Sequence, residues 1–408
     1  MQCGLLGRKL GHSYSPQIHN ALGDYDYNLF EVEPEALDSF FQNSNFSGIN
    51  VTIPYKKAVI PYCSELSPCA EKLGAVNTIV KKADGSLIGH NTDYFGFSSM
   101  LETSGLCVAG KKVLVLGSGG ASATVVAVLQ EAGAIPIVIS RSGNDNYNNL
   151  HNHYDASVVV NTTPVGMFPQ VGESLLDLQQ FPNLEGVLDV IYNPARTQLL
   201  LQAESLGLVA QNGLCMLVAQ AKESAEWFTG RTISNSEISR IHQKLRQQME
   251  NIILIGMPGS GKSTVGKMLA EKLGKQFIDA DAEIEKQAGI SIPSIFESQG
   301  ETGFRKIETD VLAQIGKQSG LVIATGGGCV TQARNYPHLH QNGTIVWLKR
   351  DIGMLPTNGR PLSQSGSLDK MFAIRKPLYE AFSDFSVCNN GAAESTVNAI
   401  LTALNWEA

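Results

Sequence analysis

Short apolar runs alternate with longer segments of helical periodicity along most of this chain. The runs predict β-strands, and the segments between them predict helices. Such alternation is typical of α/β folds built on parallel sheets. The predicted strands are 48–53, 112–116, 135–139, 157–160, 186–190, 252–255, 322–324 and 344–348.

One polar stretch, Ser236 to Glu250, interrupts this alternation. It has helical periodicity, is rich in Gln, Arg and Lys, and ends directly before the predicted strand at 252–255. We therefore predict a domain boundary at 249–251 with almost no linker. The chain of 408 residues is long enough for more than one domain, since a domain usually holds about 100–200 residues.

Composition narrows the class of protein. Each domain can bury a core at 43% hydrophobic residues, and a net charge of −7 argues against a general nucleic-acid surface. No apolar stretch approaches the roughly 20 residues that span a bilayer, and the N-terminus has no basic-then-apolar signal segment. The seven cysteines are scattered without a Cys-x-x-Cys pair, which indicates reduced thiols and a cytoplasmic protein.

A glycine-rich turn follows the predicted strand at 112–116. Its sequence is Gly117-Ser118-Gly119-Gly120-Ala121-Ser122, and a helical pattern continues through Ala132. Glycines let backbone N–H groups approach a pyrophosphate at a helix N-terminus. Because Ser122 stands where the pattern Gly-x-Gly-x-x-Gly has its third glycine, the motif alone is equally compatible with a tight strand-to-helix turn.

The end of the next predicted strand, 135–139, favours one dinucleotide over another. An NAD site has an Asp or Glu there to hold the ribose 2′-hydroxyl. This chain has Ser140-Arg141-Ser142 instead, a cation between two hydroxyls that suits a 2′-phosphate. The sequence therefore favours NADP, with a solvated surface arginine as the alternative for Arg141.

Short polar motifs are dense before residue 94. They are His12-Ser13-Tyr14-Ser15-Pro16, Asn50-Val51-Thr52-Ile53-Pro54-Tyr55-Lys56, Ala75-Val76-Asn77-Thr78 and Asn91-Thr92-Asp93. Any one of them could be a turn or a helix cap. Together they supply hydroxyls, amides, a lysine and a carboxylate, which suits a polyhydroxylated substrate.

With the Gly117–Ser122 turn and three later motifs, this set resembles shikimate dehydrogenase over about residues 1–246. The later motifs are Asn161-Thr162-Thr163-Pro164-Val165-Gly166-Met167, then Asp189 to Pro194, then Asn212-Gly213 through Gln220. The resemblance implies NADP-dependent, reversible reduction of 3-dehydroshikimate to shikimate. It also implies two lobes: residues 1–93 with 213–248 for substrate binding and catalysis, and a Rossmann-type NADP lobe of residues 94–212.

The resemblance assigns roles in this region. Lys56 and Asp93 would be the catalytic pair, since hydride arriving at a carbonyl carbon makes an alkoxide that must gain a proton. Which of the two donates the proton stays open, and a structural ion pair is the alternative. Ser13 and Ser15 would hold the substrate carboxylate, and the other substrate contacts would be Thr52, Asn77, Asp93, Tyr192 and Gln220. NADP would contact Gly117, Ser118, Gly119, Gly120, Ala121, Ser140, Arg141, Ser142, Asn161, Thr162, Met167 and Gly213.

A second glycine-rich loop follows the predicted strand at 252–255 and opens a helical pattern at 265–273. Its sequence, Gly256-Met257-Pro258-Gly259-Ser260-Gly261-Lys262-Ser263-Thr264, is that of a phosphate-binding P-loop. In such loops backbone N–H groups cradle phosphates, the lysine reaches the β- and γ-phosphates, and the serine binds Mg²⁺. The loop predicts binding of ATP with Mg²⁺ and leaves the acceptor open.

Downstream motifs narrow the acceptor. They are Asp279-Ala280-Asp281, Phe296, Gly300-Glu301-x-x-Phe304-Arg305-x-x-Glu308 on a helical pattern, Gly326-Gly327-Gly328, Gly359-Arg360-Pro361-Leu362 and Arg375-Lys376-Pro377-Leu378-Tyr379. The combination resembles shikimate kinase over about residues 251–408. This implies a parallel α/β P-loop domain of the nucleoside monophosphate kinase type, over 250–408, that phosphorylates the 3-hydroxyl of shikimate.

The second resemblance also assigns roles. Asp281 would hold the acceptor hydroxyls, Asp279 and Ser263 would contact Mg²⁺, and Lys262 and Arg360 would act on the ATP phosphates. Arg305 and Arg375 would clamp the substrate carboxylate with bidentate geometry. Surface solvation is the alternative for each arginine. Phe296, Gly327 and Gly328 complete the predicted substrate site.

Two segments are shorter than is usual in these families. About twenty residues separate Arg141 from Asn161, and the segment 143–149 is predicted to be a loop that shortens the adenosine side of the NADP site. Eleven residues, 349–359, separate the predicted strand end at Leu348 from Arg360, with Arg350 the nearest candidate to stack on adenine. We expect weaker binding of NADP, and either weaker binding of ATP or altered lid closure in the second half.

The two regions predict consecutive reactions, because the product of the first is the substrate of the second. A bifunctional enzyme is the preferred interpretation, and the short linker makes direct transfer of shikimate between sites a hypothesis. Two alternatives stay open: one half is a binding or scaffold domain, or the dehydrogenase half accepts quinate. The expected partners are small molecules rather than nucleic acid or membrane, and the oligomeric state is not predicted.

Overall fold

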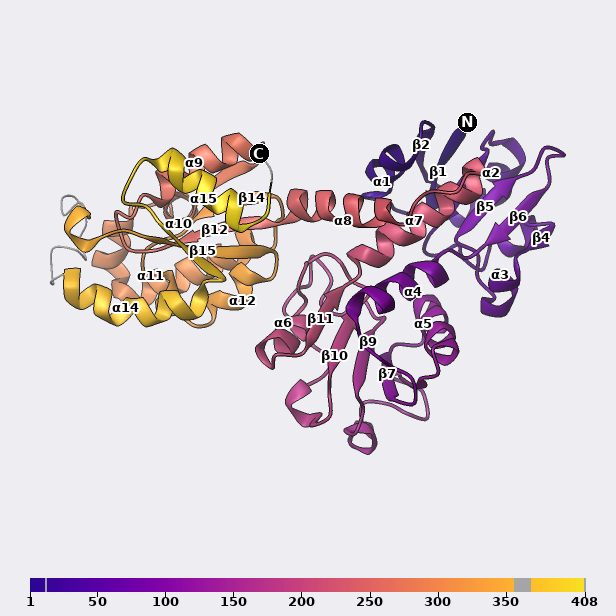
Figure 1. The fold of residues 1–408 in the computed structure, drawn as a ribbon, viewed down its shortest axis with the longest axis horizontal. Coiled ribbons are helices and arrows are strands. Elements are labelled where there is room, and N and C mark those ends of the chain that lie inside the picture. Colours follow the sequence, from indigo (N-terminus) through magenta and orange to yellow (C-terminus); the bar gives the residue numbers. More distant parts are fainter. Residues whose placement is uncertain (12, 356–367, 407–408) are drawn as a thin grey trace. The chain divides into compact units, whose positions relative to one another are not determined.

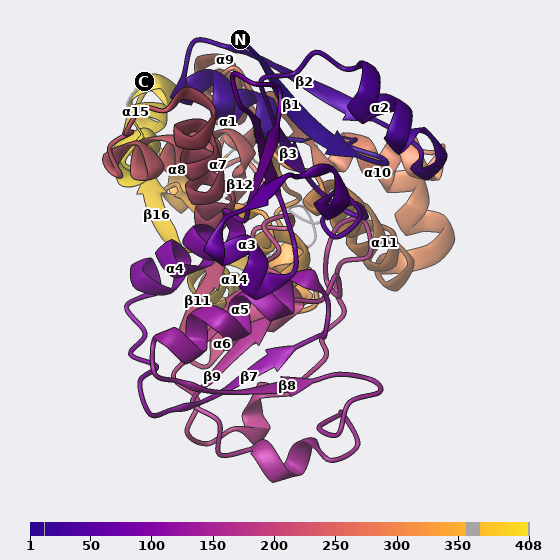
Figure 2. The same ribbon diagram turned by 90° about the vertical axis from the view of Figure 1, so that its right-hand side faces the viewer.

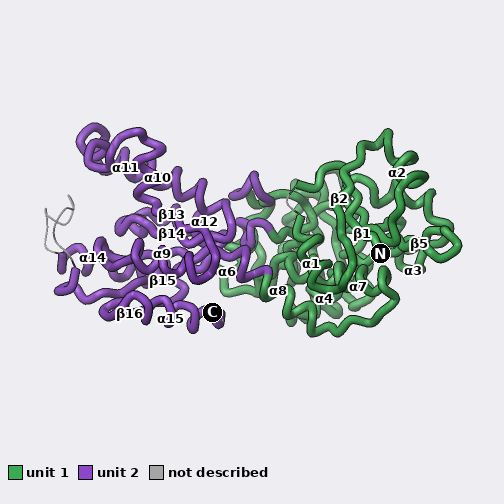
Figure 3. The backbone as a smooth tube through the Cα atoms, turned by 90° about the horizontal axis from the view of Figure 1, so that it is seen from above, with its two compact units in different colours: residues 1–166, 173–192, 199–244 green, residues 167–172, 193–198, 245–408 purple. Residues whose placement is uncertain are grey.

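The computed structural model describes residues 1–11, 13–355 and 368–406. Two compact units emerge: unit 1 comprises 1–166, 173–192 and 199–244, and unit 2 comprises 167–172, 193–198 and 245–408 (Figure 3). Helix α8 (Ser236–Met249) ends two positions before the start of strand β12 (Asn251–Ile255). The predicted helix before the P-loop strand is therefore confirmed, with Glu250 alone between the two elements.

The first sheet of unit 1 is mixed, although the sequence pattern predicts parallel sheets. Its strand order is β2-β1-β3-β5-β6-β4, with β1 parallel to β2 and β3, and β5 antiparallel to β3 and β6. A tight turn joins β5 to β6, with the Lys82 N–H bonded to the Ser86 carbonyl, and such a turn can only join antiparallel strands. The strands are β1 (Gln2–Gly7), β2 (Asp26–Glu31), β3 (Gly48–Val51), β4 (Glu65–Leu66), β5 (Thr78–Lys81) and β6 (Leu87–His90).

Helices cover both faces of this sheet. On one face Leu6 and Ile49 pack with residues of α2 (Leu37–Asn43) and α3 (Pro68–Leu73). On the other face Cys3 and Leu5 pack with α1 (Ser15–Leu22) and with Phe228 of α7 (Leu214–Thr229). Helix α7 is distant in sequence, so its packing brings Gln220 to the first sheet.

The second sheet of unit 1 is parallel, with the order β11-β10-β9-β7-β8. Its strands are β7 (Lys112–Leu116), β8 (Ile135–Ile139), β9 (Val158–Asn161), β10 (Gly186–Asp189) and β11 (Val209–Asn212). The chain goes from β7 to β8 on one side and returns to β9 on the other, so the carboxyl ends of β7 and β9 form a topological switch point, where α/β sheets bind ligands. Helices α4 (Asp93–Ser104) and α5 (Gly120–Glu131) cover one face and α6 (Gln198–Ser205) the other (Figures 1 and 2).

The sheet of unit 2 is also parallel, with the order β13-β14-β12-β15-β16. Besides β12, its strands are β13 (Gln276–Asp279), β14 (Leu321–Ala324), β15 (Gly343–Lys349) and β16 (Phe385–Cys388). Helices α9 (Lys262–Leu273) and α15 (Ala393–Ala403) pack on one face. Helices α10 (Ala280–Ala288), α11 (Ile292–Gly316), α12 (Asn335–His340) and α14 (Leu368–Phe382) pack on the other (Figure 1).

The remaining regular elements are short 3₁₀ helices at Pro34–Ala36, Ile60–Tyr62, Leu150–His153, Leu178–Gln180, Cys329–Thr331 and Ile352–Met354. All seven cysteines are free in the structure. Within the described ranges, no helix has both the length and the apolar character that crossing a membrane requires. The predicted strands at 112–116 and 135–139 are confirmed at every residue. The predicted strand at 252–255 begins one residue earlier, and the one at 344–348 is longer by one residue at each end.

Candidate active sites

The predicted catalytic pair of unit 1 lies in direct contact. Lys56 follows β3, Asp93 is the first residue of α4, and 2.5 Å separates Lys56 Nζ from Asp93 Oδ2. The Asp93 side chain is 7% exposed and that of Lys56 28% exposed. Asn91 Oδ1 accepts the backbone N–H of Asp93 at 3.1 Å and fixes the helix start. The carboxylate is therefore held in place, while the ammonium group can meet a ligand and give it a proton.

Two predicted substrate-binding amides lie beside each other. Asn77 stands before β5 and Gln220 on α7, and Asn77 Nδ2 donates to Gln220 Oε1 at 3.3 Å. Asn77 Oδ1 in turn accepts the backbone N–H of Thr92 at 2.7 Å. Because Thr92 precedes Asp93, one hydrogen-bonded chain links both amides to the segment that carries the catalytic carboxylate.

The predicted carboxylate-binding serines stand at the start of α1. The backbone N–H of Ser15 donates to Ser13 Oγ at 3.2 Å. Between them, Tyr14 meets Tyr192 edge to face, with ring centroids 6.2 Å apart. Burial raises the pKa of Tyr192, and Tyr14 adds to the rise. Thr52 is half-buried at the end of β3, where its backbone N–H donates to the Leu6 carbonyl.

The predicted NADP residues lie at the switch point of the second sheet. Gly117 has φ +104°, and a Cβ there would come within 2.9 Å of Thr163, so only glycine fits. Thr162 donates to the Leu116 carbonyl at 2.6 Å. Asn161 is buried and donates to Asp189 Oδ1 at 3.0 Å, which ties the ends of β9 and β10 together. The remaining predicted residues there are Ser118, Gly119, Gly120 and Ala121, which lead into α5.

The predicted loop after β8 is confirmed, and asparagine side chains close it. Asn149 Oδ1 accepts the Asn146 N–H at 2.7 Å, and His153 Nε2 lies 2.8 Å from Asp145 Oδ1. Ser140 is buried at the base of this loop, whereas Arg141 and Ser142 are exposed. Both exposed side chains are thus available to an anion. Met167 is 46% exposed, and a Cβ on Gly213 would lie 2.1 Å from the Val190 carbonyl oxygen.

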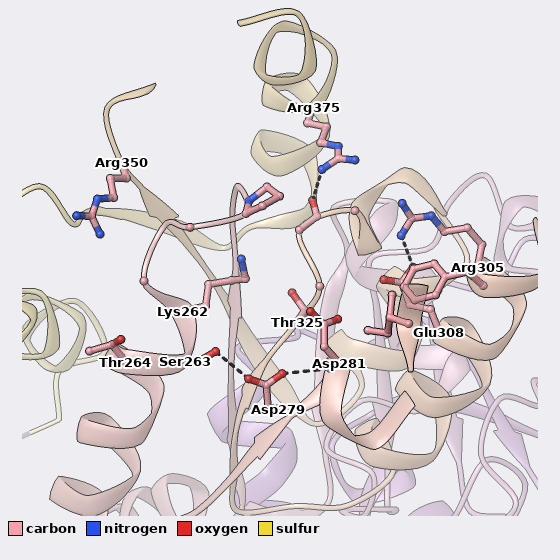
Figure 4. Close-up of a pocket in the computed structure, with 18 of the residues that line it drawn as sticks. Lys262, Ser263, Thr264, Asp279, Asp281, Arg305, Glu308, Thr325, Arg350 and Arg375 are labelled. Carbon is pink, nitrogen blue, oxygen red and sulfur yellow. Dashed lines mark hydrogen bonds and ion pairs between the residues drawn. The ribbon is translucent and has the colours of Figure 1, made fainter. Parts of the chain in front are cut away.

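The P-loop of unit 2 has the predicted strand, loop and helix. Gly256, Gly259 and Gly261 all have positive φ. Lys262 is buried and donates to the Gly256 and Met257 carbonyls at 2.9 and 3.1 Å. The lysine thus lies over its own loop, with its ammonium directed into the space that Figure 4 shows. Thr264, the last residue of the motif, also lines this space.

Two aspartates flank the P-loop at the end of β13. Asp279 Oδ2 accepts the Ser263 hydroxyl at 2.8 Å, and Asp279 Oδ1 caps α10 by accepting the Asp281 N–H at 3.1 Å. Burial raises the pKa of Asp281, and the charge of Asp279 raises it further. Asp281 is therefore a better proton acceptor than an ordinary aspartate.

Two predicted arginines reach the same cavity from different helices, α11 and α14 (Figure 4). Arg305 is 5% exposed and donates to Glu308 Oε2 at 2.8 Å and to Glu301 Oε1 at 3.1 Å. Arg375 donates to the Gly327 carbonyl at 3.2 Å. The predicted surface alternative does not describe either group, since both are buried.

The cavity in unit 2 has a volume of about 450 Å³. Phe296 stacks on Phe304 at 4.7 Å in its wall, and Arg305 lies over the Phe304 ring. The helical pattern there is broken at Gly300, whose φ of +66° splits α11 in two. The wall also includes Pro258, Asp279, Asp281, Gly327, Gly328 and Arg350. Arg360, predicted to act on the ATP phosphates, lies outside the described residues.

Comparison with known proteins identifies the first region. Residues 5–79 match the family model of the shikimate dehydrogenase substrate binding domain. The shikimate dehydrogenase (NADP(+)) of Clostridium perfringens is 34% identical over 265 residues, which cover 60% of this chain and 97% of that protein. The chain belongs to the shikimate dehydrogenase family. The shikimate dehydrogenase (NADP(+)) of Bacillus cereus is 36% identical over 259 residues, which cover 56% of this chain and 92% of that protein.

Solved structures agree with this family. The chorismate mutase/shikimate 5-dehydrogenase fusion protein of Clostridium acetobutylicum has a TM-score of 0.57 at 37% identity, covering 60% of this chain and 97% of that one. Quinate dehydrogenase of Corynebacterium glutamicum in complex with NAD has a TM-score of 0.55 at 28% identity, covering 60% of this chain and 98% of that one. Residues 258–405 match the family model of shikimate kinase. The chain thus joins a shikimate dehydrogenase region to a shikimate kinase domain.

Several residues of these two sites escape the sequence prediction. In the dehydrogenase region, Ser224 is buried and donates to the Gln220 backbone carbonyl, and its only signal is a hydroxyl four residues after Gln220 on the same helix. In the kinase domain, Asn389 donates to the Ser260 carbonyl at 2.7 Å and so holds the P-loop from β16. Thr325 follows β14 and lines the cavity. No motif marks the last two residues.

Proposed function

We propose that the dehydrogenase region reduces 3-dehydroshikimate to shikimate with NADPH and that the kinase domain transfers a phosphoryl group from ATP to the shikimate 3-hydroxyl. The observation that carries the proposal is a contacting Lys56–Asp93 pair in the same chain as a cavity lined by a P-loop, two aspartates and two arginines. The product of the first reaction is the acceptor of the second, so the two assignments support each other.

In the dehydrogenase region, the pair handles the proton that the carbonyl reduction requires. NADPH supplies the hydride when it is bound at the switch point. Lys56 is the more exposed partner, so it faces the developing alkoxide, and the buried Asp93 keeps the ammonium in position. Arg141 is exposed beside Ser142 and supplies the positive charge for the 2′-phosphate. The NADP(+) in the names of the curated relatives supports this choice of dinucleotide.

In the kinase domain, the positions of the side chains suggest a division of labour. Arg305 and Arg375 bind the carboxylate of shikimate, and Asp281 accepts the proton of the attacking hydroxyl. Lys262 and the backbone of the P-loop hold the ATP phosphates. Arg350 lines the cavity and remains our candidate for adenine.

The residues near the P-loop fit a Mg²⁺ ion. Ser263 and Asp279 present a hydroxyl and a carboxylate 2.8 Å apart, and oxygen donors of this kind are what Mg²⁺ prefers. The described residues include no cluster of three or more His, Cys, Asp or Glu side chains for a metal, so phosphate oxygens and water would complete the shell. Bound Mg²⁺ would neutralise charge on the phosphates.

We also propose that shikimate is the substrate and that the chain works in the cytoplasm. Curated relatives are named for shikimate, although the likeness to a quinate dehydrogenase keeps quinate as the competing substrate to test. Cys107 and Cys388 are exposed free thiols, which a reducing compartment keeps free.

A coupled assay on the purified chain tests both activities. The chain is given 3-dehydroshikimate and NADPH, with and without ATP and Mg²⁺, and both NADPH loss and phosphate ester are followed. We expect NADPH loss in both cases and ester only with ATP. Shikimate supplied directly should also yield ester. If either step is absent while the other proceeds, that half is a binding or scaffold domain, and replacement of 3-dehydroshikimate by 3-dehydroquinate tests the alternative substrate.

A further inference from the structure

A cluster of buried polar side chains lies behind the substrate-binding amides of the dehydrogenase region. Ser224 is its centre, with 0% of the residue exposed. Ser224 Oγ lies 2.7 Å from Asn50 Nδ2, 3.0 Å from Thr78 Oγ1 and 3.1 Å from Thr92 Oγ1. It also lies 2.9 Å from the Gln220 carbonyl oxygen, one turn earlier on α7. Four segments of unit 1 therefore meet at one hydroxyl.

The donors and acceptors of this cluster can be assigned. A hydroxyl has one proton and two lone pairs, and a carbonyl oxygen can only accept. Ser224 therefore gives its proton to the Gln220 carbonyl, and its lone pairs accept from Asn50 and from a threonine hydroxyl. Ser224 is thus fully used: one of the two threonines, Thr78 or Thr92, donates to it, and the other keeps its hydroxyl proton for Asn77 Oδ1.

The same reasoning fixes both substrate-binding amides. The backbone N–H of Thr92 can only donate, so the atom it contacts must be Asn77 Oδ1. Thr78 and Thr92 hydroxyls also lie within 3.1 and 3.2 Å of this oxygen. Asn77 consequently turns its Nδ2 to Gln220 Oε1. Among the described residues, N–H groups of both amides then make no other hydrogen bond and are left for a ligand: one on Asn77 and both on Gln220.

We infer that Ser224 is a positioning residue for the dehydrogenase site, which holds Asn77 and Gln220 as hydrogen-bond donors to the hydroxyl oxygens of the substrate. This inference rests on the proposed function of the region. Ser224 touches neither NADP nor substrate in this role. It acts on Gln220 through the helix backbone and on Asn77 through the two threonines. Without the Ser224 hydroxyl, Asn50 and one threonine lose a buried acceptor, and both threonine hydroxyls then compete for Asn77 Oδ1.

The test is Ser224→Ala in the full chain, with shikimate oxidation by NADP⁺ as the assay. Wild type and variant are each given shikimate, 4-deoxyshikimate and 5-deoxyshikimate. We expect KM for shikimate to rise about tenfold, the size of one lost net hydrogen bond, and kcat to change by less than about threefold. The preference of shikimate over at least one deoxy analogue should shrink, because that analogue lacks the hydroxyl that the amides hold.

Two further variants separate positioning from stability. Thr229→Ala is the matched control, because Thr229 donates to the Ala225 carbonyl at 2.7 Å on the same helix, one turn beyond Ser224. It should leave the preference unchanged. Ser224→Cys fills the same space with a weaker hydrogen-bonding group, so it should act in the same direction if Ser224→Ala fails to fold.

The outcomes are distinct. An equal loss of kcat/KM for all three compounds in the Ser224 variants, or no change, overturns the role of Ser224 and leaves the proposed function standing. A wild-type chain that does not oxidise shikimate overturns the proposed function itself, and the positioning role with it. A loss of preference confined to the Ser224 variants supports the inference.

Discussion

The two sites solve the problem of holding polar groups in different ways. In the dehydrogenase region the functional side chains contact one another: Lys56 meets Asp93, and Asn77 meets Gln220. In the kinase domain Ser263 and Asp279 also contact each other, but Lys262 and Arg375 donate to backbone carbonyls and line an open cavity. The first site is assembled before any ligand arrives, whereas ligands would complete the second.

Buried atoms without partners sharpen this contrast. In the kinase cavity Arg305 Nε and Glu308 Oε1 are buried and make no hydrogen bond among the described residues, and the same holds for Ser260 Oγ in the P-loop. An unsatisfied buried polar group costs about 1–3 kcal/mol. Over the ranges that the structure describes, no buried side-chain atom without a hydrogen bond is found at Lys56, Asp93, Asn77 or Gln220. We therefore expect loss of the Lys56–Asp93 pair to affect the reaction step and loss of the kinase arginines to affect ligand binding.

The largest expected effect is the loss of Lys56. Lys56→Ala removes the group that meets the alkoxide, and general acid catalysis contributes about 10²–10⁴-fold. Dehydrogenase kcat should fall by that factor, measured by NADPH absorbance, while kinase activity stays unchanged. Lys57→Ala is the control, since Lys57 is the exposed neighbour. The pair would be a structural ion pair if kcat drops by less than about tenfold, or if the variant changes KM and leaves kcat as it was.

The next effect concerns the kinase arginines. Arg375→Lys keeps the charge but loses the bidentate geometry towards a carboxylate. Since a hydrogen bond to a charged group is worth about 1.5–3 kcal/mol, KM for shikimate should rise about 10–100-fold, with a smaller change in kcat. Phosphorylation kinetics over a range of shikimate concentrations measure this. Lys376→Ala, an exposed change next to it, serves as control. If instead kcat falls and KM does not rise, the kinase site is as fully assembled before ligand binding as the dehydrogenase site.

A smaller effect is expected on the pH dependence of the kinase. Burial and then the charge of Asp279 raise the pKa of Asp281. Because a base must be ionised to accept a proton, kcat/KM should fall with decreasing pH at a pH above the ordinary aspartate range. Asp279→Asn removes the like charge, so the pKa of Asp281 falls. The acid limb of the pH profile, where kcat/KM decreases, should therefore move to lower pH.

The position of that limb is the measurement, because Asp279→Asn also lowers the amplitude of the activity by removing a predicted Mg²⁺ contact. Asp310→Asn, an exposed change on α11, should leave the limb in place. A limb that stays put in Asp279→Asn, or moves to higher pH, would contradict Asp281 as the base.

Short motifs at strand ends made most of these sites predictable. Gly117–Ser122, the P-loop and Asp279-Ala280-Asp281 each follow an apolar run, and the parallel sheets bring such ends to one edge. In contrast, β1, β2 and β16 were not predicted. Burial alternates or is partial along β2 and β16, so no continuous apolar run marks them, and the buried strand β1 contains two glycines.

The buried polar cluster around Ser224 also could not be predicted from the sequence. Ser224, Thr78 and Asn50 lie on three elements distant along the chain, and a hydroxyl on a helix usually faces solvent. Only the packing of α7 against the first sheet turns Ser224 inward. The antiparallel β5–β6 pair escaped for a related reason: its strands are four residues long, and the turn at 82–86 carries the only signal.

The smallest expected effect is on stability and concerns Gly300, the residue that splits α11. Its φ of +66° suits glycine, and a Cβ there would meet nothing within 4 Å, so Gly300→Ala adds backbone strain alone. The cost should be about 1 kcal/mol, measured as a lower urea midpoint for the loss of kinase activity. Gly391→Ala is the matched control, because its surroundings are equally open and its φ is not positive. Since the break at Gly300 separates Phe296 from Arg305, a straightened helix would move the cavity wall and raise KM for shikimate as well. An unchanged midpoint with a raised KM would mean that the helix straightens without strain, and that this wall, unlike the dehydrogenase pair, is not fixed until shikimate binds.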